Sequence, residues 1–279
     1  MRTVVFDIGG TAVKYGVFDE NGFLADQFSV ADEGDSLPER LCATAQTYAA
    51  DRVAISAPGP FDFESGTGQM RHKLASLYGV SLRERFAAVL PGVPVVFVHD
   101  LTAFAAGVLA RWPELGGQPF ACATLGTGLG YAVVSGGKVL LNDRQTPYRP
   151  LWNCPYEDGI CEDYVSAAAF LREAERMGYA FDSVKALAIA AENEPRLQAV
   201  FDAVGRHFGT CIRQAQARDR FAVLVIGGQI ARAFGRMRAA FESVCTVPYR
   251  VVDDPSTCAL RGLYAIAERG KDAFGRIMI

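Results

Sequence analysis

Two acidic residues and two glycine-rich turns are the parts of this sequence whose types and spacing could do chemistry. Asp7-Ile8-Gly9-Gly10-Thr11 follows a short apolar segment, and Gly126-Thr127-Gly128-Leu129-Gly130 follows another. Glycine lets backbone N–H groups approach a phosphate closely, and a carboxylate beside them is in range of Mg²⁺. Asp100 is the second acidic candidate, because phosphoryl transfer to an alcohol needs a group that orients the hydroxyl and accepts its proton.

Each of these features also has a plainer explanation. The Asp7 to Thr11 segment alone is as compatible with a tight hairpin as with a phosphate site. Gly126 to Gly130 lacks the spacing and the following acidic residue of a dinucleotide fingerprint, and no G-x-x-x-x-G-K-[ST] motif occurs. A lone Asp at a strand end is more often a helix N-cap, which Asp100 would be for a helix from Leu101 to Arg111. The second glycine turn changes the balance, since two such turns can hold a nucleotide's phosphates between them.

The predicted elements place these residues at the ends of strands. The strands, recognised by short apolar runs between turn residues, are Thr3 to Asp7, Ala12 to Phe18, Arg52 to Ser56, Val93 to Val98, Phe120 to Leu125, Tyr131 to Val134 and Ala222 to Ile226. The helices beyond Leu101 to Arg111 are Leu37 to Ala50, Glu162 to Met177, Ser183 to Glu192, Arg196 to Ala217 and a last one from about Leu260. Gly227-Gly228 then forms a third glycine turn, between a strand and a helix, where an adenosine could lie.

The strand, glycine turn and strand of residues 3–18 recur about 117 residues later. This internal repeat predicts two related α/β lobes. No low-complexity linker separates them, so the boundary is expected in short segments near Arg111 to Gln118. The N-terminal lobe is predicted to comprise residues 1–112 and 263–279, and the C-terminal lobe residues 113–262.

Composition excludes several classes of protein. Lys and Arg total 28 against 31 Asp and Glu, so no basic field is available for nucleic acid. The first residues do not follow the plan of a signal peptide. Leu115 to Gly137 is uncharged, but its glycines and Pro119 favour a buried hairpin over a membrane helix. The seven cysteines are scattered, odd in number and without a C-x-x-C pair, which predicts reduced, mostly core thiols in a cytoplasmic protein.

Together these motifs resemble those of the ROK family (repressor, open reading frame, kinase) of the sugar kinase and actin-like ATPase superfamily. Asp7 to Thr11 resembles the family's first phosphate motif, and Gly126 to Gly130 resembles the second. Ser56-Ala57-Pro58-Gly59-Pro60 is similar to its S-x-P-G-P loop, and Ile226-Gly227-Gly228 to its adenosine motif. Asp100 stands where the family has the catalytic Asp of an N-D-A-N segment. Five motifs in the family's order span essentially the whole chain.

The resemblance implies an α/β fold of the two-lobed actin-like ATPase (ribonuclease H-like) class, with nucleotide and substrate in the interlobe cleft. It implies a homodimeric kinase that uses ATP and Mg²⁺ to phosphorylate a hydroxyl of a sugar or sugar-like molecule, with Asp100 as general base and Asp7 holding Mg²⁺ through water. The residues implied to bind the nucleotide are Asp7, Gly9, Gly10, Thr11, Lys14, Gly126, Thr127, Gly128, Gly227 and Gly228. The residues implied to bind the substrate are Pro58, Gly59, His99 and Glu162.

The sequence departs from the family pattern in its sugar and zinc motifs. His99 replaces the first Asn of N-D-A-N. The family's G-E-x-G-H and C-x-C-G-x-x-G-C-x-E segments correspond to residues 148–152 and 153–162, where Gly159 and Glu162 match. The three cysteine positions and the histidine position fall on Asn153, Pro155, Ile160 and Trp152. Cys154 and Cys161 are each displaced by one residue, and a tetrahedral site wants four N or S ligands, so zinc is not expected.

Two of the substrate contacts and two other functions stay open at this point. Glu162 is equally compatible with an acidic residue in the first turn of a helix, and His99 with a satisfied buried histidine. A ROK repressor would need a helix-turn-helix before the first hairpin, which here starts at residue 3. A catalytically silent sugar or nucleotide sensor would not need Asp100, so its retention favours an enzyme.

Overall fold

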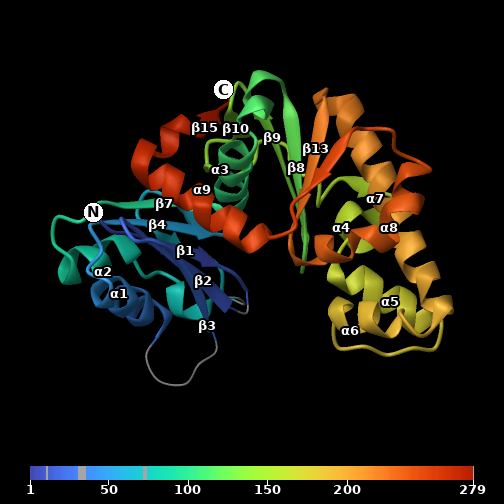
Figure 1. Ribbon diagram of the computed structural model, residues 1–279, viewed down its shortest axis with the longest axis horizontal. Helices are drawn as coiled ribbons and strands as arrows, with labels where there is room; N and C mark the ends of the chain where they lie inside the picture. The colour runs from blue at the N-terminus through green and yellow to red at the C-terminus, as the bar shows by residue number, and fades with distance from the viewer. Residues whose placement is uncertain (11, 31–35, 72–73, 279) are drawn as a thin grey trace. The chain divides into compact units, whose positions relative to one another are not determined.

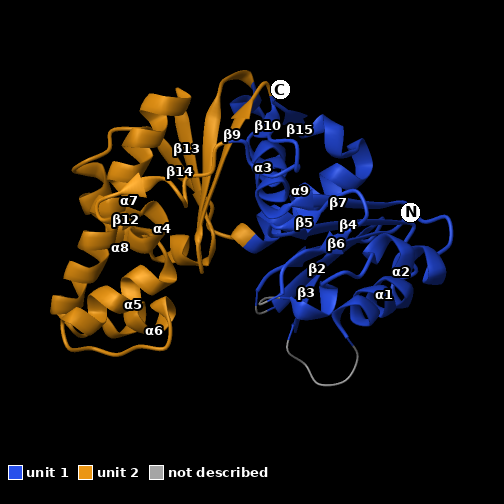
Figure 2. Ribbon diagram, turned by 180° about the vertical axis from the view of Figure 1, so that it is seen from behind, with its two compact units in different colours: residues 1–116, 137–148, 256–279 blue, residues 117–136, 149–255 orange. Residues whose placement is uncertain are grey.

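A computed structural model of the chain describes residues 1–10, 12–30, 36–71 and 74–278. The chain divides into two compact units, coloured separately in Figure 2. Unit 1 contains residues 1–116, 137–148 and 256–279, and unit 2 contains residues 117–136 and 149–255. Unit 1 therefore takes in residues 137–148, which the sequence analysis had assigned to the C-terminal lobe, and its last segment begins at Ser256 rather than at 263. The predicted two-lobed α/β organisation is confirmed.

Unit 1 is built on a five-stranded sheet with the strand order β3-β2-β1-β4-β7. Its strands are β1 (Thr3–Ile8), β2 (Ala12–Asp19), β3 (Gly22–Ser29), β4 (Arg52–Ala57) and β7 (Val95–His99). The first three form an antiparallel meander, whereas β1, β4 and β7 are parallel. The carboxyl ends of parallel strands share one edge of a sheet, so the residues at the ends of these three strands lie together.

Helices cover both faces of this sheet (Figure 1). One face packs against α1 (Leu37–Thr47) and α2 (Leu82–Val89), in a core that includes Phe6 and Phe86. The other packs against α3 (Asp100–Arg111) and α9 (Pro255–Arg269), in a core that includes Val5 and Leu263. Adjacent strand residues point to opposite faces, so a strand buried on both sides must be apolar throughout. This explains the continuous apolar runs that revealed β1 and β7.

Helices α3 and α9 cross at two glycines. A Cβ atom added to Gly107 would overlap the carbonyl of Cys258, and one added to Gly262 would overlap the carbonyl of Ala103. The two backbones therefore touch at the crossing, with no room for a side chain. Since α3 begins at Asp100, this crossing fixes the helix that carries the candidate base.

Short elements complete unit 1. These are β5 (Phe61–Asp62), β6 (Thr67–Gly68), β10 (Lys138–Leu141), β15 (Gly275–Ile277) and the 3-10 helices η1 (Ala75–Leu77), η2 (Pro113–Gly117) and η5 (Lys271–Ala273). Strands β10 and β15 pair in parallel, and backbone hydrogen bonds of 2.7 Å from Val139 N to Phe274 O and 2.8 Å from Met278 N to Leu141 O flank the pairing. The last residues thus form part of unit 1.

In the main sheet of unit 2, the strands follow the order β14-β13-β8-β9. They are β8 (Phe120–Leu125), β9 (Leu129–Ser135), β13 (Val223–Gly227) and β14 (Tyr249–Val251). Strands β8 and β9 are antiparallel, which confirms the hairpin predicted for the uncharged segment Leu115 to Gly137. Strand β13 runs parallel to β8 and β14. No described helix is long and apolar enough to cross a membrane.

The rest of unit 2 is helical apart from a small hairpin of β11 (Pro155–Tyr156) and β12 (Gly159–Ile160). The helices are α4 (Cys161–Tyr164), α5 (Ala167–Arg176), α6 (Val184–Ala190), η3 (Pro195–Leu197), α7 (Gln198–Asp219), η4 (Gln229–Ala233) and α8 (Phe234–Glu242). The single helix predicted from Glu162 to Met177 is wrong. It breaks after Tyr164 because the amide of Ala167 donates instead to Gly126 O, at 3.0 Å.

Candidate active site

Asp7 lies at the end of β1, beside the first glycine turn. Its carboxylate accepts a 2.7 Å hydrogen bond from the Ser56 hydroxyl at the end of β4, and Lys14 stands opposite it on β2. Burial raises the pKa of Asp7 above its usual value, against the opposing effects of Ser56 and Lys14, and the charge of Asp100 raises it further. The two predicted carboxylates therefore interact within unit 1.

The first turn leaves open space at one of its two glycines. Gly9 N donates a 3.0 Å hydrogen bond to Ala12 O, and a Cβ at Gly9 would lie 2.9 Å from that oxygen, so this position requires glycine for the turn itself. No atom lies within 4 Å of a Cβ added at Gly10. The backbone at Gly10 is thus accessible to a ligand. Thr11, also predicted to bind the nucleotide, lies outside the described residues.

Asp100 is the first residue of α3, and His99 is the residue that caps the helix. The N-cap role considered for Asp100 therefore belongs to its neighbour. Asp100 Oδ1 accepts a hydrogen bond from the amide of Leu101 at 2.7 Å and lies 2.8 Å from His99 Nδ1. Two acceptors would repel at 2.8 Å, so Nδ1 carries the proton and donates it to the carboxylate. A protonated Nδ1 cannot also accept from Leu101 N, so the 3.2 Å contact between these two nitrogens is not a hydrogen bond, and Asp100 Oδ1 is the acceptor for this amide.

The ionisation of Asp100 is decided by these hydrogen bonds. Burial raises its pKa, but the charge and hydrogen bond of His99 and the amide of Leu101 lower it, and the net pKa is below the usual value. The side chain keeps 44% of its surface exposed, so a ligand can reach the carboxylate. The N-terminus of α3 also favours negative charge. Asp100 is therefore an ionised, accessible carboxylate at neutral pH.

The loop after β4 approaches the end of β7. A Cβ added at Gly59 would lie 3.9 Å from His99 Nε2 and 3.5 Å from Thr146 Cγ2, which are ordinary van der Waals distances. Pro58, the preceding predicted contact, is half-buried in the same loop. The His99 side chain is 13% exposed, and its ring centroid is 6.0 Å from that of Phe63. The structure thus brings Gly59 and His99 together next to Asp100.

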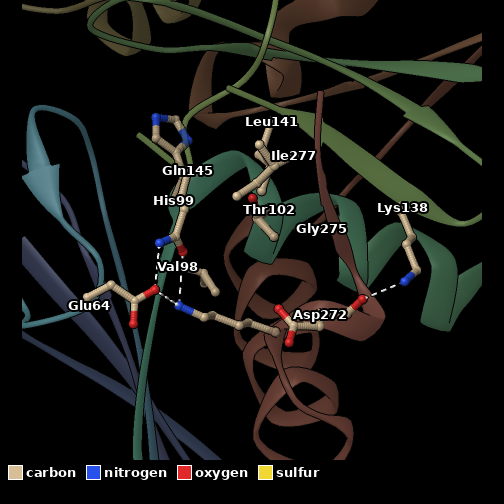
Figure 3. Close-up of a pocket in the computed structure, with 11 residues that line it drawn as sticks. Glu64, Val98, His99, Thr102, Lys138, Leu141, Gln145, Asp272, Gly275 and Ile277 are labelled. Carbon is tan, nitrogen blue, oxygen red and sulfur yellow. Dashed lines mark hydrogen bonds and ion pairs between the residues drawn. The ribbon is translucent and has the colours of Figure 1, made fainter. Parts of the chain in front are cut away.

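A cavity of about 340 Å³ lies behind His99, wholly within unit 1 (Figure 3). Lys271 Nζ donates to Glu64 Oε1 at 2.5 Å and to Gln145 Oε1 at 3.0 Å, and Gln145 Nε2 donates to Glu64 at 2.7 Å. Among the described residues, the hydroxyl of Thr102 is the buried side-chain polar atom without a hydrogen-bond partner, and Thr102 lines this cavity. No local sequence pattern marks this cavity, because its residues come from distant segments.

In unit 2, Glu162 lies against the second glycine turn. Its Oε2 atom accepts a 2.8 Å hydrogen bond from Leu129 N, and a Cβ at Gly128 would overlap its carboxylate. Gly126 N donates to Gly128 O at 3.1 Å, yet a Cβ at Gly126 would meet no atom within 4 Å, and Thr127 is exposed. Neither interpretation of Glu162 from the sequence included this contact with the turn.

The third glycine turn stands beside the second. Gly227, at the end of β13, pairs with Thr124 at the end of β8. Gly228 has a φ of +84°, and a Cβ there would overlap the backbone of Leu125. Glycine is therefore needed at 228 for close packing of the two strand ends, whatever ligand binds there. Both turns lie at the same edge of the unit 2 sheet.

The residues present fit magnesium but not the family's zinc. Mg²⁺ prefers few carboxylates and several waters, and the Asp7 carboxylate, held by Ser56 and near Asp100, is suited to such a role. For zinc, the residues at the corresponding positions, Asn153, Pro155, Ile160 and Trp152, supply no set of N and S donors. Within the described part of the chain, no group of three or more His, Cys, Asp or Glu side chains is arranged to hold a metal.

The architecture is that of a two-lobed α/β protein with the actin-like fold. A ROK family glucokinase from Streptomyces griseus, solved in complex with glucose and AMPPNP, shares the fold with a TM-score of 0.77 and 20% identity, over 97% of this chain and all of that one. The chain matches the ROK family over residues 3–254 and belongs to it. The predicted family and fold class are confirmed.

Two curated relatives are similar in sequence. A β-glucoside kinase of Listeria monocytogenes is 30% identical over 150 residues, which cover 52% of this chain and 50% of that protein. A glucokinase of Thermotoga maritima is 26% identical over 261 residues, covering 86% of this chain and 78% of the relative. The first alignment thus spans about half the length of the relative, whereas the second extends over both units.

Proposed function

We propose that the protein is a kinase that transfers a phosphoryl group from ATP to a hydroxyl of a sugar or sugar-like molecule. The observation that carries the proposal is the ionised carboxylate of Asp100, ordered by His99 and Leu101 and placed near the Gly59 loop. Membership of the ROK family and similarity to sugar kinases support it. Pro58, Gly59, His99 and Glu162 are the proposed acceptor contacts.

The geometry of Asp100 suits a general base. Among the described residues, the partners of Asp100 both bond to Oδ1, so Oδ2 is the atom to which an acceptor hydroxyl would donate. The lowered pKa keeps the carboxylate ionised until the alcohol oxygen bonds to the γ-phosphorus and the bond from that phosphorus to ADP breaks. The alcohol proton then passes to Asp100, which suits a late transfer in a loose transition state.

We assign the nucleotide to the three glycine turns. In unit 1 the proposed contacts are Asp7, Gly9, Gly10, Thr11 and Lys14, and in unit 2 they are Gly126, Thr127, Gly128, Gly227 and Gly228. The open backbone at Gly10 and Gly126 supports phosphate contacts there. Mg²⁺, held by Asp7 through water, would neutralise phosphate charge. We further propose that the protein acts as a cytoplasmic homodimer and does not bind nucleic acid.

The test is turnover with a panel of acceptors. Purified protein is incubated with Mg-ATP and separate hexoses, amino sugars, β-glucosides and polyols, and release of ADP and of phosphorylated product are both measured. We expect acceptor-dependent product with at least one compound and ADP release well above the acceptor-free level. Binding of ATP and a sugar, measured by calorimetry, without product from any acceptor would contradict the proposal and favour the silent sensor.

A further inference from the structure

Two cysteines face each other across the small hairpin of unit 2. The register of β11 and β12 pairs Pro155 with Ile160 and Tyr156 with Gly159, so the next residues outward, Cys154 and Cys161, are directly opposed. The 3.0 Å hydrogen bond from Cys161 N to Cys154 O extends the pairing to them. Opposed residues point to the same face, and the Cα atoms of such a pair are about 5.5 Å apart, within the range that a disulfide spans.

Cys154 is the accessible member of this pair. All seven cysteines are free, and Cys154 is the one whose side chain is not buried. Arg218 donates a hydrogen bond from Nη1 to Cys154 Sγ at 3.2 Å. Arg218 also forms an ion pair with Asp219, at 2.7 Å, which holds the guanidinium beside the sulfur. The guanidinium thus places a positive charge against the accessible sulfur, and the thiolate is the form of a cysteine that reacts with oxidants.

Cys161 is buried and has a thiol neighbour of its own. The thiol of Cys211 on α7 is a neighbour of Cys161, and their interaction lowers the pKa of Cys161 while it raises the pKa of Cys211. Cys211 therefore acts as the donor and keeps its proton. The arrangement gives an exposed thiol, a buried partner across the hairpin and a third thiol that stabilises the partner's thiolate.

We propose that Cys154 and Cys161 form a hydroperoxide-reactive thiol pair that closes to a disulfide. The Cys154 thiolate attacks a peroxide oxygen, forming an S–O bond and breaking the O–O bond, so the distal oxygen leaves as an alcohol, or as water from hydrogen peroxide, after taking a proton. The Cys161 thiolate then attacks the Cys154 sulfur, and hydroxide leaves and is protonated to water. The two thiols lose two electrons and the peroxide gains them.

Formation of the Cys154–Cys161 disulfide would affect the second glycine turn. A disulfide draws its Cβ atoms to about 3.8 Å, closer than the roughly 4.5–5.5 Å of opposed strand residues. Cys161 must therefore shift, and with it Glu162, whose carboxylate holds Leu129 N and lies against Gly128. This consequence, a change in ATP affinity on oxidation, rests on the proposed kinase function. The disulfide itself does not.

The experiment treats the full, reduced chain with hydrogen peroxide, blocks residual thiols with an alkylating reagent and maps the peptides without reduction. We expect free thiols to fall from seven to five and a peptide that links Cys154 to Cys161, reversed by dithiothreitol. Cys154→Ser and Cys161→Ser should abolish the link, whereas Cys211→Ser, and Cys245→Ser as a buried control, should retain it. Arg218→Gln should slow its formation about tenfold.

Three results would overturn the proposal, and each can be read from the wild-type protein. They are a peptide that links Cys161 to Cys211, oxidation of Cys154 to sulfinic acid with no link, and seven thiols that remain free. ATP affinity is then compared by calorimetry between the reduced and oxidised wild type, with Cys154→Ser as control. A disulfide without acceptor phosphorylation would contradict the kinase proposal alone.

Discussion

The β1–β2 turn of unit 1 and the β8–β9 turn of unit 2 have the same topology but different chemistry. In each, a buried strand enters a glycine turn, returns antiparallel and has a parallel neighbour, β4 in one unit and β13 in the other. At the second-to-last residue of the strand that enters the turn, however, the two sequences differ. Asp7 of β1 pairs with Lys14, whereas Thr124 of β8 pairs with Gly130.

The two turns are therefore alike in their backbones and differ in the side chains beside them. The second turn has no carboxylate of its own at the strand end and instead receives Glu162 from α4. Both turns can offer backbone N–H groups, but only the first joins them to a buried carboxylate beside Asp100. We therefore infer that the turns contribute alike to phosphate binding and that catalysis and metal binding depend on unit 1. The following predictions test this division.

The largest expected effect is that of Asp100→Asn. Loss of the general base should lower turnover by about 10²-fold or more, while ATP affinity and thermal stability change little. Steady-state assays, ATP titration and thermal unfolding measure the three quantities. The exposed Asp143→Asn is the matched control in the same unit. Turnover within twofold of wild type would remove Asp100 from the mechanism.

The next effect compares the two turns directly. A Cβ at Gly10 or Gly126 meets no protein atom within 4 Å, so Gly10→Ala and Gly126→Ala should fold normally yet block close approach of a phosphate. We expect each to weaken ATP binding about tenfold, or about 1.4 kcal/mol. Gly235→Ala in α8, which also has open space, is the control. If Gly10→Ala weakened ATP binding and Gly126→Ala did not, the two turns would not contribute alike to phosphate binding.

The third prediction concerns magnesium. If Asp7 holds the metal through water, the wild type should bind ATP at least tenfold more tightly with Mg²⁺ than with EDTA, because the metal relieves repulsion between phosphate, Asp7 and Asp100. Asp7→Asn should reduce this ratio, whereas changes in unit 2 such as Gly126→Ala should not. Calorimetry in both conditions provides the measurement. Equal affinities of the wild type with and without Mg²⁺ would show that Asp7 has no metal-linked role.

A smaller effect is expected at Gly59. An added methyl group fits at ordinary contact distances from His99 and Thr146, so Gly59→Ala should leave stability unchanged but occupy space near the proposed acceptor. The acceptor KM should rise about three- to tenfold with kcat nearly constant, the pattern of lost binding common to ground and transition states. Gly116→Ala, whose Cβ would lie 3.6 Å from Leu109, is the control. An unchanged KM would place the acceptor elsewhere.

The smallest effect is on stability. The pKa of Asp7 in the folded state is raised above its reference value of 3.8. At pH values between the reference pKa and the folded-state pKa, the folded protein therefore binds more protons than the unfolded chain, and the free energy of unfolding falls as the pH rises through that range. Asp7→Asn, which cannot ionise, should therefore have a slightly higher Tm than wild type at pH 7. The gain should shrink as the pH is lowered toward 3.8. A lower Tm at pH 7 would mean that the Ser56 hydrogen bond dominates.

The sequence revealed the parts of the fold whose signals are local. Strands such as β1 and β8 were predicted because apolar runs end at glycine turns, and their ends gave the candidate site residues. The edge strand β3 was missed because its residues are mostly exposed and show no apolar run. Strand β15 was missed for a different reason, since its partner β10 lies more than 130 residues earlier in the chain.

The partners of the site residues could not be predicted in the same way. Ser56 was recognised by its motif, but its hydrogen bond to Asp7 depends on the adjacency of β1 and β4. The contact of Glu162 with Leu129 depends on where α4 meets the second turn, and the cavity behind His99 combines Glu64 with Lys271, 207 positions away. Such pairs follow from sheet order, which no motif encodes.

The glycine crossing of α3 and α9 has a consequence for how this protein can change. A side chain at Gly107 or Gly262 would push apart two backbones in contact and tilt the helix that begins at Asp100. Evolution and the laboratory therefore have little freedom in that scaffold. Change is easier in the loop that carries Gly59, where an added Cβ would meet only the side chains of Thr146 and His99. A library for directed evolution is best confined to that loop.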